Sequence, residues 1–173
     1  DFSAYERVFG FSNFFKFDPS YSELFLTSRI IDSLIIGLGS SSLTLIIGIY
    51  AGYYISRINF KFKRYLIISI LSARMMPLVS IAIPIYFVYE RINLLDTYIG
   101  IIFVHTFINL PLAVLLLKSF FDEVPKQIDE NAYIDGASKI KILHKLVVPC
   151  AKSGIAVTFI LSLIFSWTEF ICA

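Results

Sequence analysis

The chain has little charge, and this absence is the first guide to what it is. Only 16% of its 173 residues are Asp, Glu, Lys or Arg, whereas 57% are hydrophobic and the mean hydropathy is +0.77. An ordinary soluble domain carries about 25% charged and about 45–50% apolar residues. The composition therefore excludes an ordinary soluble domain and indicates a protein whose main solvent is lipid.

A dominant sign of charge is also missing. The 15 Lys and Arg residues nearly balance the 13 Asp and Glu residues, which leaves a formal net charge of +2. A protein that binds nucleic acid would show a basic face. No nucleic-acid partner is therefore expected.

Cysteine is scarce, with Cys150 and Cys172 as the only two in the sequence. They are expected near opposite ends of one membrane helix, roughly 30 Å apart at about 1.5 Å per residue. A disulfide cannot bridge that distance. No disulfide framework is predicted, and a small apolar role is expected for each.

The motifs of common enzymes are absent as well. The sequence contains no G-x-x-x-x-G-K-[ST] phosphate loop, no G-x-S-x-G and no H-E-x-x-H,. The two histidines, His105 and His144, are expected in a membrane span and in a connector, so they cannot form one metal site. We predict no catalytic residue, no metal and no cofactor in this chain.

What the sequence does contain is a series of long apolar runs. Each is about as long as the 20 residues that cross a hydrocarbon core. We predict an all-α, multi-pass membrane protein, a polytopic helical bundle with about four spans in this fragment. The spans are expected at about 31–54, 65–89, 98–117 and 148–173.

Basic residues near the span ends predict the orientation, because Lys and Arg resist translocation. They crowd the first connector, at Arg57, Lys61, Lys63 and Arg64, and the third, at Lys118, Lys126, Lys139, Lys141 and Lys145. We expect both connectors in the cytoplasm and residues 1–30 on the external side. Because a chain that begins outside is awkward to insert, we also expect that further spans precede and follow this fragment.

The second run contains residues that are costly in lipid, namely Arg74, Pro77 and Pro84. A proline removes a backbone donor and bends the helix, which is tolerated where protein or water satisfies the freed carbonyls. Two interpretations stay open. The residues line a translocation path, or Arg74 snorkels to the interface and the prolines shape the packing.

Polar residues also lie in the third and fourth runs. His105 and Asn109 are expected to form interhelical hydrogen bonds or to contact a polar solute. Glu169 is interfacial or faces a water-filled cavity. An alternative from another class is an intramembrane enzyme with Arg74, His105 and Glu169 as its acid–base set, which would require the three to converge on one cavity.

The third connector has the pattern of a helix, a turn and a second helix. Pro125 suits the first turn of a helix, Gly136 is expected to end that helix and Ser138 to cap the next. Four apolar residues then recur at spacings of three and four, at Ile140, Leu143, Leu146 and Val147. Such a unit can dock in a groove of another protein or lie on the inner lipid surface, and its residues favour both equally.

A resemblance separates these alternatives. Residues 130–138 read Glu-Asn-Ala-Tyr-Ile-Asp-Gly-Ala-Ser, and Pro149 follows. This segment resembles the EAA loop of ABC importer permeases. Further segments resemble the carbohydrate-uptake branch, of the maltose-type second permease: 32–34, 51–57, 74–77, 94–98 and 166–170. The sequence departs from the family at Asp32 and Thr168, where Asn is usual, and at Asn131, where Ala is usual.

The resemblance implies a type I importer permease. Residues 1–30 would be an external segment and 31–173 the transmembrane domain, with a cytoplasmic coupling loop at 118–147. The first and last of the family's six spans would be missing. The residues implied to couple the chain to an ATPase are Glu130, as the acidic contact, Ala132, Asp135, Gly136, as the turn, and Ala137.

The implied partners are ABC ATPase subunits, a second permease subunit, an extracytoplasmic solute-binding protein and the lipid bilayer of the cell's cytoplasmic membrane. ATP and Mg would be bound by the ATPase partner. The implied cargo is a sugar or polyol, with phosphate, an amino acid or a metal as the alternative. Five residues form the candidate translocation path: Arg74, Pro77, His105, Asn109 and Glu169.

Overall fold

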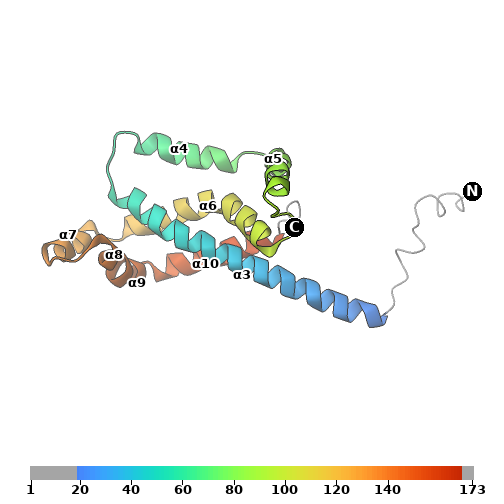
Figure 1. Ribbon diagram of the computed structural model, residues 1–173. Coiled ribbons are helices and arrows are strands. Elements are labelled where there is room, and N and C mark those ends of the chain that lie inside the picture. The colour runs from blue at the N-terminus through green and yellow to red at the C-terminus, as the bar shows by residue number, and fades with distance from the viewer. Residues whose placement is uncertain (1–18, 169–173) are drawn as a thin grey trace, which may run out of the picture. The chain divides into compact units, whose positions relative to one another are not determined.

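The computed structural model describes the backbone of residues 19–168 and the side chains of residues 29–77 and 80–168. Within these ranges every regular element is a helix (Figure 1), which confirms the all-α class. The elements are α3 (Pro19–Arg57), α4 (Lys63–Arg74), α5 (Leu78–Arg91), α6 (Tyr98–Glu123), α7 (Lys126–Ile134), α8 (Lys139–Ile142), the π-helix η1 (Leu143–Val147), α9 (Val148–Cys150) and α10 (Lys152–Thr168). The chain divides into two compact units, Asp1–Ile35 and Ile36–Ala173, and the helical bundle lies within the second.

Two of the described helices are long and apolar enough to cross a membrane. They are the Arg29–Arg57 part of α3 and the whole of α6. A third candidate is the pair Lys139–Cys150 and Lys152–Thr168, which is bent by 83° at its break. Three of the four expected spans therefore have a helical counterpart.

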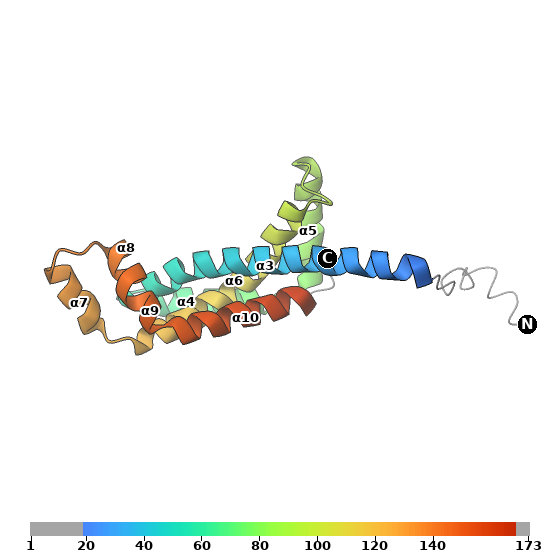
Figure 2. The same ribbon diagram turned by 90° about the horizontal axis from the view of Figure 1, so that it is seen from below.

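The expected second span, 65–89, was wrong as a single helix. It consists of α4 and α5, with 12 and 14 residues, each shorter than the about 20 residues that a span requires,. Pro77 causes the break, because it has no N–H to donate and it disfavours helical geometry in the residue before it. It adopts an extended conformation, and α5 leaves in a new direction (Figures 1 and 2).

Glycines let α3 and α10 approach α6 closely. A Cβ atom added to Gly52 of α3 would lie 3.0 Å from the backbone nitrogen of Lys118. One added to Gly154 of α10 would lie 2.1 Å from Cγ of Phe120. Small residues at such contacts allow the van der Waals packing that holds membrane helices together. Helix α6 is therefore the central element of the bundle.

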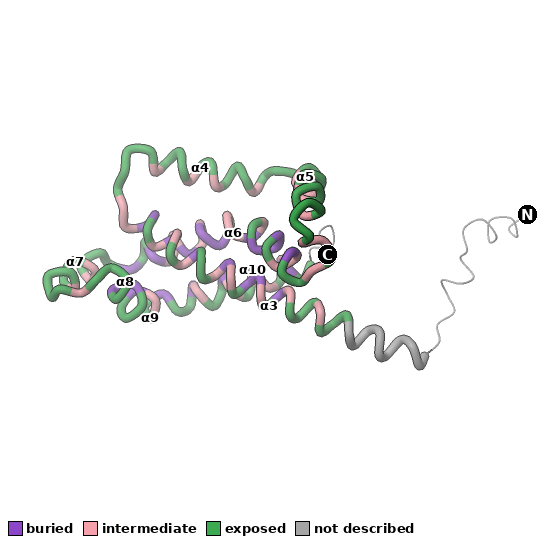
Figure 3. Tube along the Cα trace, viewed as in Figure 1, coloured by how far each residue is buried: buried purple, intermediate pink, exposed green. Residues whose placement is uncertain are grey.

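A buried apolar cluster lies around the end of α6, whose last residues (118–123) are also the start of the connector, residues 118–147. We call this cluster the connector core; it consists of Leu117, Phe121, Val124, Ile142, Leu143, Val147 and Ala151. Figure 3 shows buried segments along α6 and in part of the connector. The connector core joins the end of α6 to α8, η1 and α9, so it supports the connector from within the same chain.

The expected apolar face of the second connector helix is confirmed at Leu143 and Val147 and wrong at two positions. Ile140 is 65% exposed and Leu146 is 36% exposed, whereas Ile142 is buried. The reason is the π-helix at Leu143–Val147. Its i→i+5 bonding widens the turn and shifts the register that an α-helical spacing predicts.

Candidate functional site: the connector and its attachment to α3

The connector begins with a helix, a glycine turn and a capped second helix, as expected from the sequence. Helix α7 ends at Ile134, and Gly136 takes φ +78°, a left-handed conformation that glycine adopts without strain,. The Ala137 N–H then donates to the Ala132 carbonyl at 3.0 Å, which closes the turn,. The hydroxyl of Ser138 accepts a hydrogen bond from the Lys141 N–H and caps α8.

Helix α7 has an inner and an outer face. On the inner face, Ile128 and Ala132 pack against the connector core, and so does Ala137 after the turn. On the outer face, Tyr133 is 66% exposed and Ile134 is 82% exposed. The outer face therefore offers large apolar side chains that the described part of the chain leaves uncovered.

The five expected coupling residues divide between these faces. Ala132 and Ala137 are partly buried, whereas Glu130, Asp135 and Gly136 are exposed. Asn131 is exposed too, so its larger side chain, in place of the family's usual Ala, does not crowd the connector core.

A charged attachment that the sequence did not reveal joins α7 to the end of α3. Nη2 of Arg57 lies 2.9 Å from Oδ2 of Asp129, and the side chains are only 12% and 15% exposed. The Tyr53 hydroxyl donates to Oδ1 of the same carboxylate at 2.5 Å. We call Tyr53, Arg57 and Asp129 the Asp129 clasp. A groove of about 410 Å³ runs beside it, between α3 and α7.

The sequence pattern indicated orientation at Arg57, which also lies in the 51–57 segment of the resemblance, and it predicted no contact for Asp129. The only local signal was that both residues carry charge next to apolar segments. The clasp pairs residues that are far apart in the chain, and no periodic pattern brings such residues together.

The same end of α3 contacts the last turn of α6. The Ser56 hydroxyl donates to Oδ1 of Asp122 at 2.6 Å, and Lys118 forms an ion pair with the other oxygen of that carboxylate. The Lys63 amine donates to the Ser56 carbonyl at 3.3 Å. Burial lowers the pKa of this amine, and the charge of Asp122 opposes the shift.

One further contact reaches the π-helix. The Tyr50 hydroxyl lies 2.8 Å from Nε2 of His144, with the two rings in an edge-on arrangement. The described end of α3 therefore touches α6, α7 and η1, which makes it the main attachment of the connector to the bundle.

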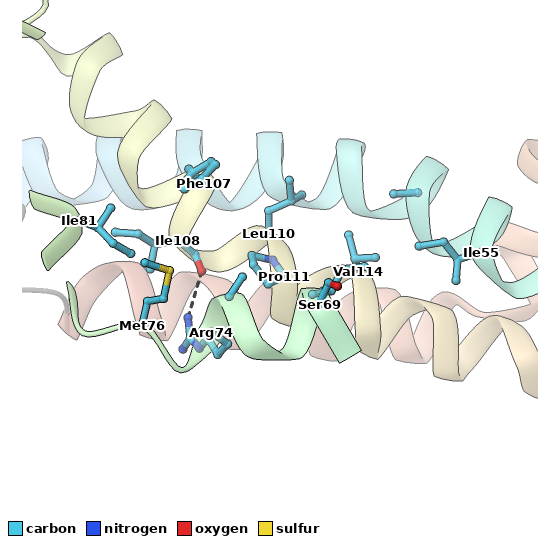
Figure 4. A pocket seen from close by; sticks show the side chains of 13 residues that line it. Ile55, Ser69, Arg74, Met76, Ile81, Phe107, Ile108, Leu110, Pro111 and Val114 are labelled. Atoms are coloured by element: carbon cyan, nitrogen blue, oxygen red, sulfur yellow. Dashed lines mark hydrogen bonds between the residues drawn. The ribbon is translucent and has the colours of Figure 1, made fainter. Parts of the chain in front are cut away.

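Inside the bundle, Arg74 lies at the end of α4 and reaches α6. Its Nη1 donates to the Ile108 carbonyl at 3.1 Å, and its guanidinium carbon is 5.0 Å from the centre of the Phe165 ring. Pro111 lacks the N–H that would bond to the Phe107 carbonyl, so Arg74 donates to the carbonyl one residue beyond the freed one,. Arg74 also lines a mostly apolar cavity of about 760 Å³, together with Met76, Phe107 and Pro111 (Figure 4).

His105 and Asn109 lie elsewhere, buried on α6 with exposures of 2% and 5%. Nδ1 of His105 is 2.8 Å from the Ser166 hydroxyl of α10, which is in turn 2.9 Å from the Ser40 hydroxyl of α3. The expected interhelical hydrogen bond is thus confirmed for His105. These three helices share a buried polar seam.

The structure does not unite the candidate path residues in one site. Arg74 lines the cavity, His105 bonds along the polar seam, and Pro77 lies exposed at the break between α4 and α5. Glu169 lies outside the described residues. The acid–base set of the enzyme alternative therefore gains no support from Arg74 and His105, which contact different groups.

An apolar helical bundle with a charged, glycine-broken connector is compatible with a membrane transport component. Residues 44–173 match the family of the binding-protein-dependent transport system inner membrane component, and the chain belongs to this family. It is a family of membrane transport components rather than enzymes.

Three of the relatives have names from the transport of sugars or a sugar derivative. The sulfoquinovosyl glycerol transport system permease protein SmoH of Agrobacterium fabrum is 31% identical over 154 residues, 89% of this chain and 54% of the relative. The trehalose transport system permease protein SugB of Mycobacterium tuberculosis is 34% identical over 147 residues, 85% of this chain and 54% of the relative. The trehalose/maltose transport system permease protein MalG of Thermococcus litoralis is 33% identical over 142 residues, 82% of this chain and 51% of the relative.

These relatives confirm the resemblance to carbohydrate-uptake permeases. The chain spans about half the length of the curated relatives that it matches.

Proposed function

We propose that this chain is part of a permease subunit of an ATP-driven, binding-protein-dependent sugar importer of the cytoplasmic membrane. Family membership and the names of three relatives support this proposal. A non-sugar solute is the alternative cargo. The connector would lie in the cytoplasm and receive movement from an ATPase subunit that binds ATP and Mg. A second permease subunit and an extracytoplasmic solute-binding protein would complete the transporter.

The observation that carries the proposal is the two-faced α7. Its inner face packs against the connector core through Ile128 and Ala132, while its outer face exposes Tyr133 and Ile134 next to the carboxylate of Glu130. Short helices that dock in a protein groove offer apolar anchors of this kind. A helix on anionic lipid would instead carry Lys and Arg beside its apolar face. Glu130 and Asp135 therefore favour a protein groove.

The exposed coupling residues would have separate roles. Glu130 would be the acidic contact of the ATPase groove, and Gly136 would form the turn that presents Asp135. Ala132 and Ala137 would contribute from the inside, because they join the docking segment to the connector core.

For the translocation path, the cavity beside Arg74 and the helix break at Pro77 are the best-supported part. The cavity is roomy and borders a discontinuous helix, a combination common along solute pathways in transporters,. His105 and Asn109 fit a role in helix packing, and Glu169 remains a candidate.

The docking role can be tested in the complete transporter. Replacing Tyr133 by Ala, or Glu130 by Lys, should weaken association of the ATPase subunit at least about tenfold, as expected for an anchor at a protein interface. Co-purification and uptake of labelled trehalose would be measured. Tyr65→Ala is the matched control, because Tyr65 is also 66% exposed but lies on α4.

The control should associate and transport normally. Normal association and uptake in both connector variants would overturn the proposed docking role.

A further inference from the structure

The Asp129 clasp selects one helix of the bundle as the partner of α7. We propose that Tyr53 and Arg57 are positioning residues that fix α7 to α3 through Asp129, so that α3 is the span to which movement of α7 is delivered. This inference rests on the proposed coupling function and adds the residues and the helix through which the coupling runs.

The chain itself joins α7 to α6 only loosely. Two residues separate the helices, and both are extended: Val124 has φ −77° and ψ 123°, and Pro125 has φ −57° and ψ 132°. No i→i−4 backbone bond can cross such a segment, because those bonds require helical geometry. Without another connection, α7 could pivot at this joint instead of moving a span.

Arg57 bridges the joint from the side. Its Nη1 donates to the Phe121 carbonyl at 3.0 Å, before the joint, and its Nη2 lies 2.9 Å from the Asp129 carboxylate, after the joint. A guanidinium can make both contacts at once because its donors form a rigid planar fork. One side chain of α3 therefore ties the end of α6 to α7.

The carboxylate of Asp129 is held at both of its oxygens. Tyr53 donates to Oδ1 and Arg57 approaches Oδ2. The guanidinium also lies over the Tyr53 ring, 5.7 Å from its centre. Since both charged side chains are largely buried, turning α7 away from α3 would leave two uncompensated charges out of water.

The apolar contacts of α7 cannot supply this orientation. Ile128 and Ala132 pack against the connector core. Apolar attraction has no preferred direction, and the side chain of alanine is too small to restrict rotation of the helix. The hydrogen bond from the Tyr53 hydroxyl to the Asp129 carboxylate fixes both distance and angle, and the Arg57 ion pair adds charge attraction,. The Tyr50–His144 contact is exposed and holds η1 rather than α7.

The test uses the whole transporter in proteoliposomes, with its ATPase subunits, second permease and solute-binding protein. The measured quantity is the number of sugar molecules transported per ATP hydrolysed. Asp129→Asn and Arg57→Gln should lower this ratio at least about fivefold, the low end of usual coupling between sites. The ATPase subunit should remain bound, because the outer face of α7 is unchanged.

Exchange of the two charges provides a readout that a general structural role would not move. Combining Arg57→Asp with Asp129→Arg should recover part of the ratio that either single change loses. Full recovery is not expected, because the bond from Arg57 to the Phe121 carbonyl is gone. The matched control is Lys118→Gln, which breaks an ion pair within α6 that does not cross the joint, and its ratio should equal that of the wild type.

A normal ratio in both Asp129→Asn and Arg57→Gln would overturn the inference while leaving the proposed function intact. Failure of the wild-type chain to bind any ATPase subunit would instead remove the proposed function. If the charge variants do not assemble, Tyr53→Phe removes a single hydroxyl.

Spin labels at Tyr54 and Lys126 of the otherwise native transporter give a second measurement. The α3–α7 distance should stay constant through the ATP cycle, and a change in this distance would overturn the inference.

Discussion

The connector end of the bundle and the α4–α5 region differ in how their apolar side chains are covered. At the connector end, Leu117, Phe121 and Val147 are each fully buried by neighbours in the same chain. Helix α4 has no buried residue, and Met75 and Phe87 are 81% and 58% exposed. Figure 3 shows the contrast along the chain, with buried segments on α6 and the connector and exposed ones along α4 and α5.

The difference follows from what surrounds each region. If the connector lies outside the membrane, as proposed, water drives the apolar side chains of its core together. In lipid the surroundings are as apolar as the side chains, so exposure of a Met or a Phe costs little. The connector core is thus covered within the chain, whereas the described side chains of α4 and α5, like the outer face of α7, are left for other molecules to cover.

The largest expected effect on the free energy of unfolding comes from removing a buried side chain of the connector core. Phe121→Ala should lower the free energy of unfolding by about 3–5 kcal/mol, because it removes a fully buried aromatic ring and leaves a cavity. Phe87→Ala is the counterpart in α5 and should cost less than about 0.5 kcal/mol. Both would be measured by unfolding in lipid nanodiscs. Equal losses in the two variants would contradict the comparison.

An intermediate effect is expected where Arg74 at the end of α4 contacts α6 and α10. Arg74→Gln removes the charged donor to the Ile108 carbonyl and the contact with the Phe165 ring, and should cost about 1.5–3 kcal/mol. Arg74→Lys keeps the charge but not the planar fork, so it should recover only part of this loss. Disulfide cross-linking between cysteines placed at Ser69 and Val114 would report whether α4 leaves α6. Unchanged stability and cross-linking in Arg74→Gln would show that α4 is held by other contacts.

The smallest effect is expected in the polar seam. Ser166→Ala removes the shared partner of His105 and Ser40, yet interhelical hydrogen bonds in membrane proteins contribute only about 0.6 kcal/mol on average. Thr168→Ala is the control, because its hydroxyl bonds to carbonyls of its own helix. Thermal unfolding of the two variants would be compared. A loss of about 2 kcal/mol or more in Ser166→Ala would contradict this estimate.

Local chemistry made much of the connector predictable. The turn at Gly136 and the cap at Ser138 depend on residues within five positions of each other, and both are present. The helical class followed from composition in the same way. The break at Pro77 was visible as a proline, but continuous hydropathy on both sides favoured a single span.

The Asp129 clasp and the π-helix could not be predicted from local sequence patterns. Tyr53 and Asp129 are separated by 76 positions, and only the packing of α3 against α6 brings them together. The π-helix changes which residues face inward without any marker in the local sequence, so Ile142 replaced Ile140 in the connector core. What depends on tertiary contact could be recognised only in the structure.

The fit of Gly154 against Phe120 has a consequence some distance away. The aromatic ring occupies the place where any larger side chain at position 154 would stand, so a bulkier residue would push the start of α10 outward. Ser166 lies 12 residues further along the same helix, α10, which corresponds to roughly 18 Å,. Over that length, a displacement of α10 near position 154 would tilt the helix and shift its other end. One missing methyl group thereby sets the alignment of the hydroxyl that meets His105.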